Sequence, residues 1–202
     1  MNVCYLIGAG EITSLPTPDN TDLVIAADGG YDALISHGVR CDLLVGDLDS
    51  IKDPASVTDV IRFPKEKDET DMYLAYREGV LRGYRDFEIY GGTGGREDHT
   101  YANYSLLIYI KEEGHTARLI SDKMVISVIE NESITLSGRV GATLSLFSLS
   151  KDSLGVTIEG AKYCLKGAIL KSSFPLGVSN EFTGSDVTVS VENGTLLIMT
   201  EK

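Results

Sequence analysis

Apolar and polar positions alternate in blocks along the first 121 residues. Short apolar runs, such as 23–27, are followed by segments with apolar residues at helical spacing, of which 69–82 is the clearest. Buried strands that alternate with helices are typical of a parallel sheet. We therefore expect strands at 3–7, 23–27, 43–45, 60–63, 87–90 and 117–120, and helices at 31–37, 69–82 and 99–111.

Helical spacing disappears after Ser121, and short strand-like segments separated by turn signals follow. Asn193-Gly194 is the strongest turn signal, and we expect it to close a hairpin between 187–191 and 196–199. Regular short strands of this kind are typical of a β-sandwich or barrel. The sequence thus predicts an α/β domain over 1–121 and an all-β domain over 122–202, with strands at 125–129, 133–136, 143–148, 155–159, 168–172, 186–191 and 195–199.

Charge and composition narrow the classes of function. Lys and Arg number 18 and Asp and Glu 30, so the net charge of −12 disfavours nonspecific nucleic-acid binding, which needs clustered positive charge. No segment approaches the roughly 18 consecutive apolar residues of a spanning helix, so we expect no membrane partner. Cys4, Cys41 and Cys164 show neither metal-ligand spacing nor a disulfide framework, which favours a cytoplasmic setting. His37 and His115 each lie beside a glycine after a helix and are expected to be solvated.

Acidic residues follow two of the predicted strands. Asp28 comes directly after the second strand, and Asp47 and Asp49 come after the third. Ligands bind beyond the carboxyl ends of the strands in an open parallel sheet. In extended backbone Asp47 and Asp49 point to the same side, and such a pair of oxygen ligands suits Mg²⁺. The alternative is a turn with a helix cap, because Asp and Ser favour both.

Asp68 and Asp71 lie at the start of the helix predicted over 69–82. They are three residues apart, so Asp68 is a candidate N-cap while Asp71 is placed to face a ligand. An acidic residue in the first turn is also favoured by the helix dipole alone. The segment therefore allows two interpretations. Either both residues only stabilise the start of the helix, or Asp71 adds a further carboxylate at the same edge of the sheet.

The segment 91–95 has four glycines in five residues and follows the fifth predicted strand. Such a loop allows backbone amides to approach a phosphate, and Arg96 adds a planar fork of donors. The loop is neither a Walker A loop nor a dinucleotide fingerprint, and a flexible turn is the alternative. His99 and Asn103, which follow it, share one face of a helix.

In order and spacing, the segments 28–30, 46–50, 67–71 and 91–99 resemble the thiamine pyrophosphokinase (thiamine diphosphokinase) family, and 177–182 extends the resemblance into the second half. The resemblance implies transfer of a pyrophosphoryl group from ATP to the hydroxyethyl oxygen of thiamine, with Mg²⁺, by a homodimer. It also implies an α/β N-terminal domain with a mostly parallel sheet, followed by an all-β sandwich C-terminal domain that contributes to thiamine binding and dimerisation.

The resemblance further implies roles for individual residues. The metal and pyrophosphate are handled by Asp47, Asp49 and Asp71, with Asp28 and Asp68 in support. The phosphates are held by Lys67, Arg96 and the backbone of Gly92, Thr93, Gly94 and Gly95. The nucleotide site is lined by Asp98, His99 and Asn103, and thiamine is faced by Ser179 and Asn180. Asp71 and Asp98 are the candidate acceptors of the hydroxyl proton.

Two other classes of function stay open. One is another Mg²⁺-dependent nucleotide transferase that uses Asp47 and Asp49, and the other is a noncatalytic nucleotide-binding module. The products distinguish them, because AMP with thiamine diphosphate fits the resemblance whereas ADP or no turnover does not. We expect direct in-line transfer, which needs positioning and charge neutralisation more than covalent chemistry.

Overall fold

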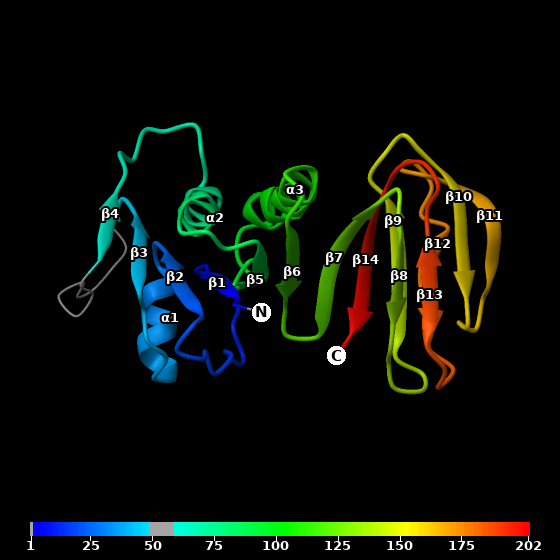
Figure 1. Cartoon of the computed structure of the whole chain (residues 1–202), viewed down its shortest axis with the longest axis horizontal. Helices are drawn as coiled ribbons and strands as arrows, with labels where there is room; N and C mark the ends of the chain where they lie inside the picture. Colours follow the sequence, from blue (N-terminus) through cyan, green and yellow to red (C-terminus); the bar gives the residue numbers. More distant parts are fainter. Residues whose placement is uncertain (1, 49–58) are drawn as a thin grey trace. The chain divides into compact units, whose positions relative to one another are not determined.

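The computed structural model describes residues 2–48 and 59–202. The chain divides into two compact units, Met1–Asp122 and Lys123–Lys202, one residue beyond the expected boundary (Figure 1). No helix in the described part of the chain is both long enough and apolar enough to cross a membrane.

The first unit carries strands in the order β6-β5-β1-β2-β3-β4, and each neighbouring pair is parallel. Strand β3 is a fully buried apolar run and β2 is buried at every position except Leu23, as a sheet covered on both faces requires. Helices α1 and α2 pack on strands β1 and β2, and α3 packs on β6. The elements are β1 Cys4–Ile7, β2 Leu23–Ala27, α1 Gly30–His37, β3 Leu43–Gly46, β4 Val60–Arg62, α2 Asp71–Leu81, β5 Asp86–Tyr90, α3 Glu97–Glu112 and β6 Thr116–Ile120.

Helix α2 begins two residues later than the sequence predicts. Thr70 is its N-cap, because the Thr70 side chain accepts a hydrogen bond from the N–H of Tyr73 at 3.2 Å. Asp68 is exposed and is not the cap, so that prediction is wrong. The later start places Asp71 at the first helical position, where the free amides and the helix dipole favour a carboxylate.

His115 is buried, contrary to the prediction that it is solvated. Its Nδ1 lies 2.7 Å from the hydroxyl of Tyr76, which is fully buried on α2. A glycine next to a helix end indicates where the helix stops, but it does not show which way the following side chain points. His115 therefore joins α2 to the segment between α3 and β6.

The second unit contains two antiparallel sheets, in the orders β12-β9-β14-β7 and β11-β10-β13-β8. Buried side chains from both sheets, such as Leu144 and Ile198 from the first and Val156 and Val189 from the second, form one core. The strands are β7 Met124–Glu130, β8 Ser133–Leu136, β9 Thr143–Ser148, β10 Asp152–Glu159, β11 Leu165–Lys171, β12 Gly177–Glu181, β13 Val187–Ser190 and β14 Thr195–Glu201.

The hairpin predicted at Asn193-Gly194 is wrong. Strand β13 pairs with β8 and β10, whereas β14 pairs with β7 and β9, so the turn passes from one sheet to the other. Other segments hold it: the Asn193 carbonyl accepts the N–H of Leu154 at 2.8 Å, and the N–H of Gly194 donates to Asn131 Oδ1 at 2.8 Å. A turn motif fixes the local backbone, but not the partner of the strand that follows.

Candidate active site

Two loops run side by side beyond the carboxyl ends of the neighbouring parallel strands β1 and β5. The N–H of Gly10 donates to the carbonyl of Gly91 at 2.8 Å, and the N–H of Glu11 donates to that of Thr93 at 2.7 Å. A side chain at Gly10 would place its Cβ 2.2 Å from the Thr93 oxygen, so this close approach requires glycine. The pairing continues the sheet and fixes the glycine-rich loop relative to the strands.

A cavity of about 280 Å³ lies in the first unit beside these loops. It brings together eight of the residues predicted from sequence: Asp28, Asp71, Gly92, Thr93, Gly95, Arg96, His99 and Asn103. The other described candidates of this unit, Asp47, Lys67, Asp68, Gly94 and Asp98, do not line it. Asp49 lies outside the described residues. The rule that ligands bind beyond the carboxyl ends of parallel strands thus locates the cavity.

Sequence reasoning missed several lining residues. Gly8, Ala9 and Gly10 form one wall, and Thr70 and Met72 flank Asp71. The signal for the first three was present, because they follow the first predicted strand as a glycine-rich turn. They carry no charged or hydroxyl group, so the search for chemistry-bearing side chains passed over them. Thr70 and Met72 could be identified as lining residues only once the start of α2 was known.

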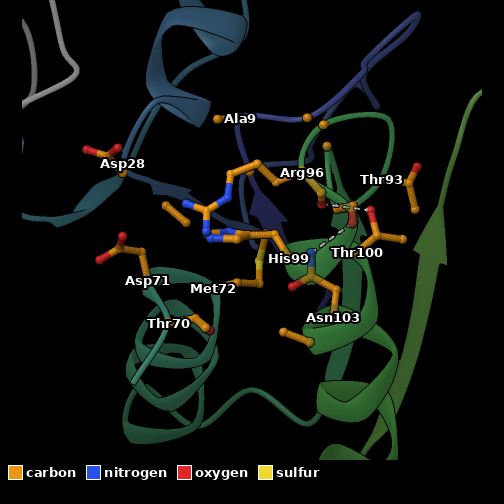
Figure 2. Close-up of a pocket in the computed structure, with 17 residues that line it drawn as sticks. Ala9, Asp28, Thr70, Asp71, Met72, Thr93, Arg96, His99, Thr100 and Asn103 are labelled. Carbon is orange, nitrogen blue, oxygen red and sulfur yellow. Dashed lines mark hydrogen bonds between the residues drawn. The ribbon is translucent and has the colours of Figure 1, made fainter. Parts of the chain in front are cut away.

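Asp28 and Asp71 lie on the same side of the cavity in Figure 2, across from Thr93 and Asn103. In the described part of the chain, Oδ1 of each is a buried side-chain atom without a hydrogen-bond partner. Lys67 Nζ lies 2.8 Å from Asp71 Oδ1 as an ion pair, but without hydrogen-bond geometry. Buried carboxylate oxygens without donors are costly unless a cation or a ligand satisfies them.

These two oxygens fit a divalent cation. Mg²⁺ prefers oxygen ligands and commonly takes one or two carboxylates together with substrate phosphates. Among residues 2–48 and 59–202, no group of three or more His, Cys, Asp or Glu side chains is arranged to hold a metal. Asp28 and Asp71 are therefore two candidate ligands, and no third His, Cys, Asp or Glu side chain among the described residues joins them.

The backbone of the two acidic turns is unusual. Asp28 has φ 46° and Leu48 has φ 65°, both in the left-handed region that non-glycine residues rarely adopt. The prediction that Asp47 and Asp49 share a side rested on extended backbone, and the left-handed Leu48 between them removes that argument. Asp47 follows Gly46, whose backbone packs against Asp28. Strained backbone at such turns is typical of functional sites.

The glycine-rich loop is tied to helix α3 by Asn103. This side chain is buried, and its Nδ2 donates to the carbonyl of Gly92 at 2.8 Å (Figure 2). His99 lies one helical turn earlier on the same face and also lines the cavity. The loop and the first turn of α3 therefore form one unit, with amides and Arg96 available to an anion.

In the second unit, Asn180 is buried and holds the backbone of Tyr163. Its Oδ1 accepts the N–H of Tyr163 at 2.9 Å, and its Nδ2 donates to the carbonyl of Tyr163 at 2.7 Å. Ser179 is exposed with φ 61°, and its N–H donates to Ser145 Oγ at 3.1 Å. Tyr163 is 59% exposed and Lys162 Nζ lies over its ring, 5.4 Å from the centroid, so this pair of segments presents an aromatic side chain and a hydroxyl.

Comparison with known proteins places both units in one family. The model described as thiamin pyrophosphokinase, catalytic domain, matches residues 17–119, and the model described as thiamin pyrophosphokinase, vitamin B1 binding domain, matches residues 125–196. The chain is 27% identical over 210 residues to thiamine pyrophosphokinase of Bacillus subtilis (strain 168), covering 98% of each protein.

Solved structures match this chain over its whole length. The crystal structure of thiamine pyrophosphokinase from Bacillus subtilis matches with a TM-score of 0.89 and 25% identity, covering 100% of this chain and 99% of that one. A thiamin pyrophosphokinase family protein from Enterococcus faecalis matches with a TM-score of 0.87 and 26% identity, over the same shares of the two chains.

Proposed function

The chain belongs to the thiamin pyrophosphokinase family, and on that premise we propose that it transfers the pyrophosphoryl group of ATP to the hydroxyl of thiamine, giving thiamine diphosphate and AMP. One structural observation supports the placement of this chemistry. Two buried carboxylate oxygens without donors share a cavity with a glycine-rich loop at the start of a helix. A cation site beside an anion site is what a metal-bound triphosphate needs.

The anion side of the cavity binds the phosphates. The amides of Gly92, Thr93 and Gly95 and the guanidinium of Arg96 donate to phosphate oxygens, and Asn103 keeps the loop in place. The α3 N-terminus adds a favourable dipole. These groups orient the nucleotide so that the β-phosphorus faces the attacking hydroxyl, which is the main requirement of an in-line transfer.

The carboxylate side would hold the metal. Asp28 and Asp71 would supply oxygen ligands, whereas Asp47 and Asp49 are ligands expected from the resemblance alone. A bound Mg²⁺ would neutralise the charge that develops on the phosphoryl oxygens. Lys67 is paired with Asp71, so in this state it neutralises a metal ligand and does not reach into the cavity. We propose that it exchanges this partner for phosphate when the nucleotide binds.

The second unit contributes to thiamine binding. The exposed Tyr163 ring offers an apolar face to a flat heterocycle, which suits a chain without Trp. Ser179 offers a hydroxyl on the neighbouring strand, whereas the amide of Asn180 is used to hold Tyr163. We assign Ser179 to contact with thiamine and Asn180 to positioning of the Tyr163 backbone.

Product analysis tests the function. The purified chain is incubated with ATP, Mg²⁺ and thiamine, and nucleotides and thiamine phosphates are separated by chromatography. AMP and thiamine diphosphate in equal amounts support the proposal. Formation of ADP, or ATP binding without turnover, would favour another nucleotide transferase or a noncatalytic binding module.

A homodimer and a cytoplasmic setting remain predictions from sequence. Light scattering in solution tests the first, because a mass close to 21.8 kDa would contradict the dimer. The second rests on the pattern of the three cysteines, which are free thiols in the structure.

A further inference from the structure

Arg96 and Asp98 form a two-point ion pair at the start of α3. Arg96 Nε donates to Asp98 Oδ1 at 3.1 Å, and Nη2 donates to Oδ2 at 2.6 Å. Asp98 Oδ1 also accepts the N–H of His99 at 2.9 Å, so the carboxylate is itself fixed to the backbone of the helix. The side chains are 73% and 63% exposed, and such a pair contributes little to folding stability.

The two partners differ in what they face. Arg96 lines the cavity and Figure 2 shows it reaching into the space between the glycine-rich loop and the two aspartates, whereas Asp98 is not a lining residue. A guanidinium has five N–H donors, and Asp98 takes only the Nε–H and one Nη2–H. The remaining donors are free to contact an anion in the cavity, and the pair restricts the rotamers of Arg96 before the anion arrives.

The same contacts make Asp98 a poor base. The hydrogen bond from Arg96 lowers the pKa of the Asp98 carboxyl, with the His99 amide acting in the same direction. A proton acceptor must also reach the substrate hydroxyl directly or through one water. Asp98 is turned toward Arg96 and lies outside the lining of the cavity.

We propose that Asp98 is a positioning residue, which holds the Arg96 guanidinium over the cavity for the phosphates of the nucleotide, and that it does not accept the thiamine proton. This inference rests on the proposed function, because it takes the bound anion to be ATP. Of the two candidate acceptors named from sequence, Asp71 is the one that lines the cavity.

The sharpest test compares Asp98→Asn with Glu97→Gln. Both remove one negative charge from the first turn of α3, and Asn keeps the acceptor for the His99 amide. Removal of negative charge alone should leave binding of anionic ATP unchanged or tighter. We expect Asp98→Asn to weaken ATP binding in calorimetry by about tenfold, the size of one charge-assisted hydrogen bond, while Glu97→Gln does not weaken it.

Two further readouts separate positioning from proton transfer. In an Arg96→Ala background, Asp98→Asn should change ATP affinity by less than about twofold, because Asp98 acts only through Arg96. In the profile of kcat against pH, the acidic limb of Asp98→Asn should lie at the same pH as that of the unmodified chain. Equal ATP affinity in Asp98→Asn and Glu97→Gln would overturn the proposal, as would loss of the acidic limb.

A measurement without substrate keeps this inference separate from the function. The Arg96 Nε–H signal in a ¹⁵N-labelled protein, assigned by its loss in Arg96→Lys, should be protected from exchange in the unmodified chain and in Glu97→Gln, but not in Asp98→Asn. If the chain makes no thiamine diphosphate, the proposed function fails, and this signal still decides whether Asp98 holds Arg96. An unchanged signal in Asp98→Asn would overturn the positioning role.

Discussion

Carboxylates of the first unit differ in what surrounds them. Asp28 and Asp71 each present a buried oxygen to which no described group donates, whereas Asp98 accepts from both Arg96 and a helix amide. Asp28 and Asp71 line the cavity, where a cation could bind them, and Lys67 is paired with Asp71. Asp98 is paired with Arg96 and does not line the cavity. Residues of one chemical type thus carry different roles because their surroundings differ.

Asp28→Asn should weaken metal binding. The substitution keeps the shape of the side chain but replaces a charged ligand by a neutral amide, so Mn²⁺ affinity measured by electron paramagnetic resonance with a nonhydrolysable ATP analogue should fall by about 10- to 100-fold. Asp32→Asn, which removes the same charge from the first turn of α1 and does not line the cavity, is the control. Unchanged Mn²⁺ affinity in Asp28→Asn would remove Asp28 from the metal site.

At the scale of elements, the cavity depends on loops that the sheet holds in register. The loop after β1 pairs with the loop after β5 through backbone hydrogen bonds, and Asn103 on α3 fixes the second loop from the other side. A flexible glycine-rich segment becomes a defined cradle only because these neighbours order it, since glycine loses much conformational entropy on folding.

Gly10→Ala should separate the two loops. Its Cβ would lie 2.2 Å from the Thr93 oxygen, so the backbone must shift, and we expect unfolding free energy to fall by about 1–3 kcal/mol, with weaker ATP binding. Chemical denaturation measures the unfolding free energy. Gly95→Ala is the steric comparison, because the nearest atom to its added Cβ is 3.8 Å away. An equal loss of stability in the two variants would contradict the claim that the close approach of the two loops requires glycine at position 10.

The burial of His115 should make stability depend on pH. Burial lowers the pKa of His115, with Arg85 acting in the same direction. As pH falls through about 6.5, the ordinary value for histidine, the unfolded chain takes up a proton more readily than the folded one, so acid destabilises the fold. His115→Gln should therefore flatten the decline of melting temperature between about pH 7 and 5. His37→Gln, at an exposed position, is the control and should leave that slope unchanged. An unchanged slope in His115→Gln would show that His115 is not the source of the pH dependence.

Much of the element pattern was predictable, because apolar runs bounded by turn residues mark strands. The expected ranges for β2, β8 and β9 coincide with those observed. Strand β12, Gly177–Glu181, was missed because only one of its residues is a strongly strand-forming type, and it pairs with β9 through a register shift. The hairpin failed because a turn motif is local, whereas the partner of a strand is set by the core that it enters.

At the scale of the whole molecule, the two units are built differently and match different models of one family, a catalytic domain and a vitamin B1 binding domain. The first unit has parallel strands whose carboxyl ends deliver carboxylates and glycines to one cavity, and the second has two antiparallel sheets around one core. The carboxyl-end rule made the cavity predictable from sequence. It did not show that Asp98 turns toward Arg96 or that Asn180 binds the Tyr163 backbone, because side-chain direction depends on the folded neighbours.

The central claim is that the carboxylate of Asp71, which lines the cavity at the start of α2, serves pyrophosphoryl transfer, and the turnover of Asp71→Asn tests it most directly. Glu69→Gln is the matched control, since it removes one exposed charge two residues earlier. With ATP, Mg²⁺ and thiamine, we expect Asp71→Asn to form thiamine diphosphate and AMP at least about 100-fold more slowly, as loss of a group that acts on the reacting centre does. Glu69→Gln should keep the rate of the unmodified chain. Equal rates in Asp71→Asn and the unmodified chain, with both variants folded, would contradict the account.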